Sequence, residues 1–294
     1  MKKLKDEAQS SDNKQGRGVY LRRMRISTAR KLDTSFTGEY RSAFKGTGLA
    51  FESVREYQYG DDVRHIDWNV SARMNNPYIK EYIEERELSI LLMIDISAST
   101  GFGGTRTKRE LILELVSLLL DLAQMSNDRI SVLLFSDQVE KFIHPRKGRR
   151  FILSVLDEIM KFRPTGTGTD IGAAVDFARR VLKKRSVVFC ISDFLDENND
   201  YFSKLRILAR RHDIIPVQVY DPLEYSMNFH GLAEFFDLET GELLLCDTIP
   251  EEKDLPITQF MYPGLILRTD EPIEQPLIRF FKRRNSMQRR AVAQ

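Results

Sequence analysis

An acidic residue and two hydroxyls follow a run of apolar residues in the first half of the chain. Residues 88–94 have almost no polar face, and Asp95, Ser97 and Ser99 come next at two-residue spacing. A parallel strand that is covered on both faces has this composition. Carboxylate and hydroxyl oxygens are the ligands that hard divalent cations prefer. The spacing therefore predicts a cation site at the carboxyl end of a buried strand.

Two later segments carry oxygen ligands that could complete this site. Residues 187–192 form a second apolar run that ends at Asp193, and the Gly/Thr loop 165–170 leads into a helix that begins near Ile171. In open α/β sheets, ligands bind beyond the carboxyl ends of the strands, where the strand order reverses. We therefore expect three loops to bring together five ligands, namely Asp95, Ser97, Ser99, Thr169 and Asp193. Asp170 and Asp137 are candidates for supporting carboxylates behind these ligands.

The ligand chemistry favours Mg²⁺, or Mn²⁺ in its place, over zinc or calcium. All five groups offer hard oxygen atoms, and no His or Cys lies near them in the sequence. The two carboxylates would balance the charge of a divalent ion. The three neutral hydroxyls would leave that ion electrophilic, with a coordination position available for another oxygen. The composition therefore suits a contact that is bridged by a metal.

Alternating strands and helices must position these loops. Short apolar runs alternate with segments whose apolar residues recur at helical spacing. The expected strands are 88–94, 130–135, 187–192 and 214–219, with 139–143 as an edge strand, and the expected helices are 111–122, 151–160, 171–182 and 201–211. This alternation predicts an α/β fold, in which a doubly wound, mainly parallel sheet carries helices on both faces, with a small β-rich appendage on the N-terminal side.

Composition divides the chain into four parts. We expect a disordered basic tail at 1–16, a segment at 17–86 that packs on the main domain, the main domain at 87–250, and an extension with a basic tail at 251–294. Within 17–86, the pattern predicts a short helix at 20–31, strands at 51–57 and 78–83, and a helix at 63–74 between these strands. The main domain is expected to end in a hairpin formed by 234–238 and 243–247.

The segment 17–86 also carries charged and aromatic residues whose role the sequence leaves open. Partly buried charges usually need partners, which favours a charge-paired structural network. A second interaction face is the alternative. The residues are Arg55, Asp61, Asp62, Arg64, Asp67, Trp68 and Arg73.

Composition also restricts the class of protein. The 294 residues are 42% hydrophobic and 30% charged, as in ordinary globular proteins, and we expect both Cys190 and Cys246 to be reduced. The first residues show no signal-peptide pattern. The most apolar helix, 111–122, contains Glu114 and Asp121 and is too short to cross a bilayer. We therefore expect a cytoplasmic protein without a transmembrane segment.

Both ends of the chain are basic. Residues 1–47 hold 12 Lys and Arg against 5 Asp and Glu, and residues 279–294 hold 6 basic residues and no acid. Such ends could bind nucleic acid or an anionic membrane surface. We favour the alternative that they are solvated or lie on the chain's own acidic surface, with Phe280 and Phe281 docking the C-terminal tail. Nucleic-acid binding is therefore not expected.

Two sets of motifs resemble known families. The Asp-x-Ser-x-Ser pattern at 95–99 resembles the metal-ion-dependent adhesion site of von Willebrand factor type A domains, and Thr169 and Asp193 are similar to the other residues of that site. A resemblance to the bacterial and archaeal family called domain of unknown function 58 is carried by residues 46–51, 54–57, 60–64, 66–69 and 71–73. These resemblances imply a von Willebrand factor type A-like fold and a partner protein that supplies a Glu or Asp to the metal. They also imply association with MoxR-type AAA+ ATPases.

These patterns predict a non-enzymatic, Mg²⁺-dependent protein-interaction module. The family resemblance implies that this module is an adaptor or cofactor of a MoxR-type AAA+ ATPase in complex assembly or protein maturation. No pair of nucleophile and base is visible in the sequence. In the alternative of a metal-dependent hydrolase, the ion would activate a water beside Asp170 and Asp137. Residues 101–108 are Gly-rich but lack the Gly-Lys-Ser/Thr ending of a phosphate loop. Nucleic-acid or membrane-surface binding through the basic ends is the other alternative.

Overall fold

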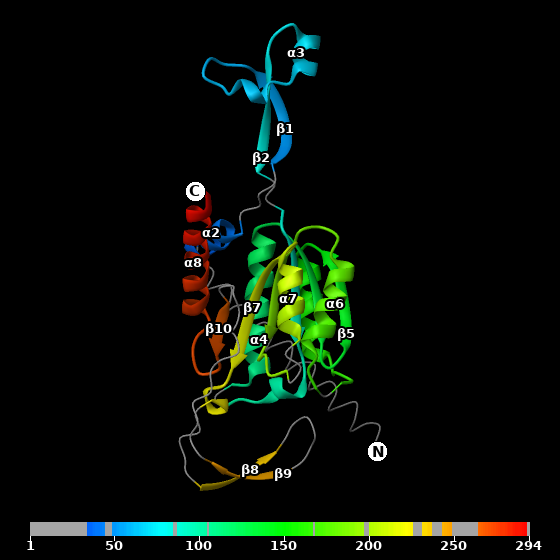
Figure 1. Ribbon diagram of the computed structural model, residues 1–294, viewed down its shortest axis with the longest axis vertical. Helices are drawn as coiled ribbons and strands as arrows, with labels where there is room; N and C mark the ends of the chain where they lie inside the picture. The colour runs from blue at the N-terminus through cyan, green and yellow to red at the C-terminus, as the bar shows by residue number, and fades with distance from the viewer. Residues whose placement is uncertain are drawn as a thin grey trace. The chain divides into compact units, whose positions relative to one another are not determined.

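The computed structural model describes residues 34–44, 49–84, 87–104, 106–166, 168–196, 200–225, 231–236, 243–248 and 264–292 (Figure 1). The chain divides into two compact units, of which the smaller consists of residues 45–87 and the larger of the rest. The predicted disordered tail at 1–16 and the predicted helix at 20–31 lie outside the described residues.

A six-stranded sheet forms the centre of the larger unit. Its strands, in spatial order, are β10 (Leu265–Arg268), β7 (Asp213–Tyr220), β6 (Val187–Ser192), β3 (Ser89–Asp95), β4 (Arg129–Phe135) and β5 (Val139–Arg146). All neighbours pair in parallel except β4 and β5, which are antiparallel. The chain winds outward in both directions from β3 and β6, which confirms the predicted doubly wound α/β fold.

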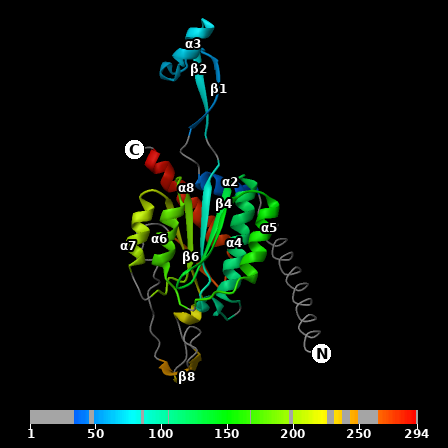
Figure 2. The same cartoon turned by 90° about the vertical axis from the view of Figure 1, so that its right-hand side faces the viewer.

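Helices cover both faces of this sheet (Figure 2). One face carries α2 (Thr34–Ala43), α4 (Lys108–Met125), α5 (Arg149–Lys161) and α8 (Glu274–Val292), and the other carries α6 (Ile171–Val181) and α7 (Tyr201–Ala209). In β3, Leu92 and Ile94 join the first of the two cores. Leu91 and Met93 join the second. β3 is therefore buried on both faces, as its apolar sequence predicts.

A capping box begins α4, the helix that follows the β3 loop. The Thr107 hydroxyl accepts a hydrogen bond from the Glu110 N–H (3.1 Å), and the Glu110 carboxylate accepts one from the Thr107 N–H (2.9 Å). Thr107→Ala removes one acceptor, so we expect the free energy of unfolding, measured by urea denaturation, to fall by about 1 kcal/mol. Thr107→Ser keeps the acceptor and is expected to change this energy little. Equal losses in both variants would contradict the capping role.

Helix α2 is an element that the sequence pattern does not predict. Phe36, Tyr40 and the adjacent Phe44 are buried. Each packs edge to face against Phe281 of α8, with ring centroids 5.8, 5.7 and 5.7 Å apart. Phe280 is 5% and Phe281 0% exposed, which confirms that these two rings dock the C-terminal tail. Both α8 and β10 fall within the range 251–294, and they complete the sheet and one of its covering layers.

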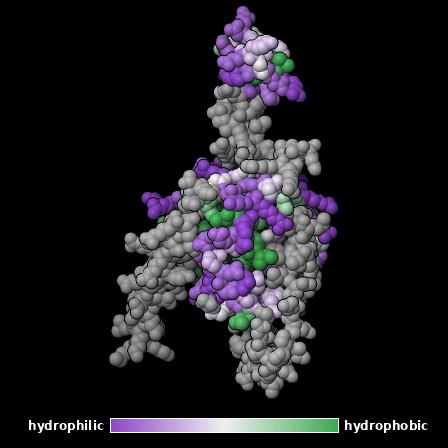
Figure 3. All heavy atoms as spheres, turned by 90° about the vertical axis from the view of Figure 1, so that its left-hand side faces the viewer, coloured by the Kyte–Doolittle hydropathy of each residue, from purple (hydrophilic) through white to green (hydrophobic). Residues whose placement is uncertain are grey.

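A basic residue of α8 binds the chain's own surface. Arg284 donates a hydrogen bond to the Ala43 carbonyl at 2.9 Å and forms an ion pair with Asp213. Its guanidinium also lies over the ring of Phe44, 4.8 Å from the centroid. Seen from the α8 side, the described surface is mainly hydrophilic, with scattered hydrophobic patches (Figure 3). The expectation that the basic tail lies on the protein itself is confirmed for Arg284.

The smaller unit consists of two antiparallel strands joined by short helical segments. β1 (Leu49–Glu56) pairs with β2 (Tyr78–Glu84), and η1 (Val63–His65) and α3 (Trp68–Met74) lie between them in the chain. The two predicted strands are confirmed. The predicted single helix at 63–74 is wrong, because Asp67 is extended and caps α3 through the N–H groups of Asn69 and Val70 (3.0 and 3.2 Å).

A second strand pair belongs to the larger unit. β8 (Gly231–Phe236) and β9 (Leu243–Thr248) are antiparallel, which confirms the predicted pairing of these segments. Among the described helices, none combines the length and apolarity that crossing a membrane requires.

Candidate metal centre

The carboxyl end of β3 holds three of the predicted ligands in a tight turn. Asp95 ends the strand, and its Oδ1 accepts a hydrogen bond from the Ser97 N–H at 2.9 Å. The hydroxyl oxygens of Ser97 and Ser99 lie 3.1 Å apart. Thr100 fixes the turn by donating from its hydroxyl to the Ser97 carbonyl at 2.7 Å. Asp95 and Ser97 are buried and Ser99 is half-buried, so the turn meets solvent at Ser99.

The end of β6 supplies the fourth predicted ligand and a further hydroxyl. Asp193 follows the strand, and its Oδ2 accepts a hydrogen bond from the Ser99 hydroxyl at 2.9 Å. Ser192 donates to Oδ2 of Asp95 at 2.6 Å, a contact that the sequence pattern does not reveal. Phe194 comes next with a φ of 60°, which is strained for a bulky side chain. The carboxylate at the end of each of these two strands thus accepts a hydrogen bond from a serine at the end of the other strand.

The loop before α6 places the other predicted residues differently. Thr169 is half-buried, and no hydrogen bond between its hydroxyl and the four ligands described so far is present. Asp170 caps α6 by accepting from the Ala173 N–H at 2.7 Å. Asp137 accepts from the Ser136 hydroxyl at 3.2 Å. The structure therefore gives Asp170 a helix-capping role, and the predicted support of the ligands by Asp170 and Asp137 stays a prediction.

This loop depends on a glycine and an acid at its base. A Cβ at Gly166 would overlap the side chain of Asp137, so only glycine fits there without a shift. Glu140 of β5 accepts hydrogen bonds from the N–H groups of Thr165 and Gly166, both at 2.8 Å. The loop that carries Thr169 is thereby fixed to the edge strand of the sheet.

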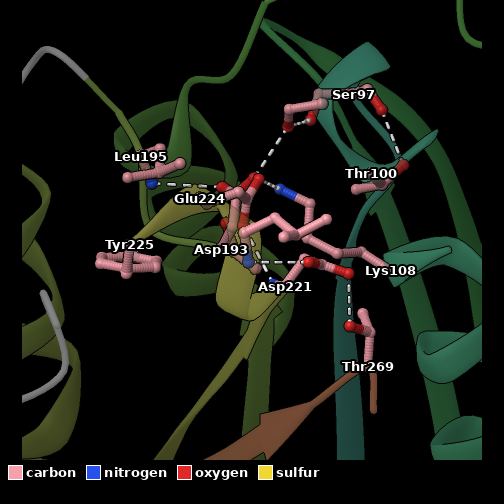
Figure 4. A network of polar contacts seen from close by, with 12 residues as sticks. Ser97, Thr100, Lys108, Asp193, Leu195, Asp221, Glu224, Tyr225 and Thr269 are labelled. Atoms are coloured by element: carbon pink, nitrogen blue, oxygen red, sulfur yellow. Dashed lines mark hydrogen bonds and ion pairs between the residues drawn. The ribbon is translucent and has the colours of Figure 1, made fainter. Parts of the chain in front are cut away.

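A buried lysine that the sequence pattern does not reveal lies against Asp193. Lys108, the first residue of α4, is 0% exposed. Its Nζ lies 2.7 Å from Asp193 Oδ2 and 2.5 Å from Glu224 Oε1 (Figure 4). Burial lowers the pKa of the ammonium, but the two carboxylates outweigh this effect and leave the pKa of Lys108 raised. Lys108 is therefore a fixed positive charge inside the site.

The site holds three acids, Asp95, Asp193 and Glu224, against the one lysine. Burial, followed by the nearby charge of Asp193, raises the pKa of Asp95 to about 7. Burial also raises the pKa of Glu224, although Lys108 acts in the opposite direction. When all three acids are ionised, the single lysine leaves two negative charges at the site. A divalent ion would balance them.

Two oxygen–oxygen separations in the site are compatible with ligands of one metal ion. Oxygens about 2.05 Å from Mg²⁺ lie about 2.9 Å apart along an edge of the octahedron. The Ser97–Ser99 and Ser99–Asp193 oxygen pairs are hydrogen-bonded at 3.1 and 2.9 Å, separations close to this edge. Among the described residues, no three His, Cys, Asp or Glu side chains gather into a metal cage. An ion here would therefore depend on hydroxyls and water for the rest of its ligands.

The polar network continues to the outer strands β7 and β10. Asp221, which follows β7, accepts hydrogen bonds from the Thr269 hydroxyl (2.5 Å) and the Gly104 N–H (2.9 Å). The Asp221 N–H donates to Glu224 Oε2 at 3.1 Å, within the capping box of η3 (Pro222–Glu224). Figure 4 shows Asp221 on Thr269 and Glu224 on Lys108. Glu224 is thus held in place from the end of β7.

The predicted charged group of the segment 17–86 lies in the smaller unit, where its acids are paired. Arg55 donates two hydrogen bonds to Asp61, at 2.6 and 2.8 Å. The Arg55 guanidinium lowers the pKa of Asp61 to about 2. Arg64 forms an ion pair with Asp62 at 2.8 Å. These pairs support the structural role that the sequence favours.

The remaining members of this group differ from one another in their surroundings. Asp67, the cap of α3, lies 3.5 Å from Lys80 of β2. Trp68 is 70% exposed, and Arg73 is exposed as well. The exposed indole leaves the second interaction face open as an alternative.

The sheet and its site define the class of protein. A doubly wound sheet with an antiparallel edge strand, and with carboxylates and hydroxyls at the switch point between β3 and β6, is the arrangement that the resemblance to von Willebrand factor type A domains implies. The chain matches the family described as protein of unknown function DUF58 over residues 53–254, and it belongs to that family. The family predicted from the sequence motifs is thereby confirmed.

Known proteins similar to this chain include mycobacterial sequences and solved structures. The uncharacterized proteins Rv1480 of Mycobacterium tuberculosis and Mb1516 of Mycobacterium bovis are each 32% identical to it, over 75% of this chain and 70% of their own. BatB from Bacteroides thetaiotaomicron is 15% identical with a TM-score of 0.48, over 68% of this chain and 99% of its own. Proximal thread matrix protein 1 of the mussel byssus, with a zinc-occupied MIDAS motif, is 17% identical with a TM-score of 0.37, over 45% of this chain and 36% of its own.

Proposed function

We propose that this chain is a Mg²⁺-dependent protein-interaction module. The observation that carries the proposal is the gathering of three oxygens at the switch point, where the Ser99 hydroxyl lies 3.1 Å from that of Ser97 and 2.9 Å from Asp193 Oδ2. Asp95 would add a second carboxylate from the neighbouring strand. Mn²⁺ could replace Mg²⁺, because both ions prefer oxygen ligands. Neutral hydroxyls make up much of the ligand set, so the bound ion would stay electrophilic.

The partner in this proposal is a protein that supplies a Glu or Asp side chain to the ion. Asp95 and Asp193 are 1% and 2% exposed, whereas Ser99 and Thr169 are half-buried. An incoming group would therefore reach the ion from the hydroxyl side. A carboxylate is a hard anionic oxygen ligand and suits a hard cation with an open position. Such a contact joins two proteins without a chemical reaction.

A MoxR-type AAA+ ATPase is the partner class that we propose. The support for this class is the resemblance of the sequence motifs together with membership of the family over residues 53–254. In this role the chain would be a non-enzymatic adaptor or cofactor of the ATPase in complex assembly or protein maturation. The acids of the site would then serve as metal ligands and charge partners rather than as catalysts.

A pull-down with a matched pair of serine variants tests the proposal. The immobilised full chain is incubated with the MoxR-type ATPase of the same organism in Mg²⁺, because a chelator would also strip the nucleotide site of the ATPase. We expect Ser99→Ala to reduce the retained ATPase at least about tenfold, since it removes one ligand of the ion. The control Ser154→Ala removes an exposed hydroxyl on α5 that bonds only its own helix at Phe151. Equal retention by Ser99→Ala and Ser154→Ala would contradict the proposal.

A further inference from the structure

The ammonium of Lys108 lies where a cation that binds Asp193 would be expected. A lysine side chain leaves water only at a large cost unless carboxylates compensate it. Here Asp193 and Glu224 both do so, at 2.7 and 2.5 Å, and the side chain is completely buried. The site thus contains a positive charge of its own before any ion arrives.

Lys108 and the proposed ion would share one oxygen. Asp193 Oδ2 accepts hydrogen bonds from both the Ser99 hydroxyl and Lys108 Nζ, at 2.9 and 2.7 Å. Any ion that takes this oxygen must therefore compete with the ammonium. Glu224 offers Lys108 a second carboxylate, so the ammonium keeps a partner when Asp193 turns to the ion.

The net charge of the site decides which ligand the ion can still accept. With Asp95, Asp193 and Glu224 ionised, Lys108 reduces the charge from three negative to two. Asp221 is left out of this count because its carboxylate faces Thr269, Gly104 and the start of η3. A divalent ion then makes the site neutral, so that a partner's carboxylate is not repelled. Without the lysine, the occupied site would stay negative and would oppose that carboxylate.

We propose that Lys108 is a built-in counter-charge that weakens Mg²⁺ binding by the free chain and makes firm binding depend on the carboxylate of a partner. This inference rests on the proposed function, because it assigns a role to Lys108 at the same site. The lysine competes with the ion at Asp193 and keeps the occupied site neutral. Metal and partner would therefore bind cooperatively.

Calorimetric titration of Mg²⁺ into four forms of the full chain tests this role. The forms are the natural chain, Lys108→Met, Glu224→Gln and the double variant. We expect Lys108→Met to bind Mg²⁺ at least about tenfold tighter and Glu224→Gln at least about tenfold weaker, because the site gains or loses one negative charge. The double variant restores the natural net charge and is expected to bind within about threefold of the natural chain. Lys204→Met on α7, which removes a lysine paired with Asp176, is the matched control and should change nothing.

The series remains decisive if Lys108→Met alone fails to fold. Lys108→Met leaves the two acids that pair with Lys108 without a positive charge. The double variant also removes one of these two acids, and Glu224→Gln alone keeps the lysine. Circular dichroism identifies the folded forms. A Mg²⁺ affinity that is equal in all folded forms, or weaker in a folded Lys108→Met, would overturn the inference and leave the proposed function standing. Binding to Lys108→Met, with none detected in the natural chain alone, would support the inference, because firm binding by the natural chain then needs the partner's carboxylate. Absence of binding in every form would overturn both.

Discussion

Asp95→Asn is expected to weaken Mg²⁺ binding strongly while preserving the fold. The amide keeps the shape of the side chain and the oxygen that accepts the Ser97 N–H at 2.9 Å. It removes one of the two negative charges that remain after Lys108 is counted, and it replaces one carboxylate ligand by an amide. We expect the affinity for Mg²⁺, measured by calorimetry, to fall at least roughly a hundredfold. Because Asn buries no charge, the metal-free variant should unfold at the same temperature as the natural chain or above it.

The matched control for this experiment is Asp157→Asn. Asp157 lies on α5 and forms an ion pair with Lys161 of the same helix. Its substitution is expected to change the Mg²⁺ affinity less than about threefold. If Asp157→Asn lost as much affinity as Asp95→Asn, the ion would not lie where the ligand geometry places it.

Phe281→Ala is expected to produce the largest loss of stability. This ring of α8 is completely buried and contacts the rings of Phe36, Tyr40 and Phe44. Its removal leaves a cavity between α2, α8 and the sheet, so the free energy of unfolding should fall by about 3–5 kcal/mol. Urea denaturation followed by circular dichroism measures this change.

Met287→Ala on the same helix is the control for the aromatic cluster. Met287 is 43% exposed, so its truncation creates no cavity and should cost less than about 1 kcal/mol. Similar losses in Phe281→Ala and Met287→Ala would mean that α8 does not dock through its aromatic face. They would then point to a general loss of helix stability.

The strand ends of the site could be predicted because they are local features of the sequence. Each of Asp95 and Asp193 follows an apolar run, and the carboxyl ends of neighbouring parallel strands meet at one edge of the sheet. The hydroxyls at two-residue spacing then pointed to an oxygen-rich turn. The structure joins Asp95, Ser97, Ser99 and Asp193 in one chain of hydrogen bonds, whereas Thr169 is not part of it.

The positive charge of the site could not be predicted in the same way. Lys108 follows a Gly-rich segment and begins a helix, a position where lysine is ordinarily solvated. Its partner Glu224 lies 116 residues further along the chain. Only the packing of α4 against the ends of β6 and β7 brings the two together. A lysine at the start of an otherwise apolar helix is the one local signal that could have drawn attention to it.

Helix α2 was missed for a different reason. Its sequence contains Thr34, Thr37 and Gly38, which are weak helix formers, so local propensity does not favour a helix. The aromatic residues Phe36 and Tyr40 stabilise it only because α8 offers them a matching face. Tertiary packing therefore decides this element, and the basic composition of the first residues hides it.

Locating the ion tests the proposed Mg²⁺ site most directly. Crystals of the full chain grown with Mn²⁺, which stands in for Mg²⁺, allow the metal to be placed by its anomalous scattering. We predict a peak within bonding distance of the Ser97 and Ser99 hydroxyls and beside Asp193, with Lys108 still paired with Glu224. The absence of a peak at saturating Mn²⁺, or a peak elsewhere with Lys108 unmoved on Asp193, would contradict the proposed site.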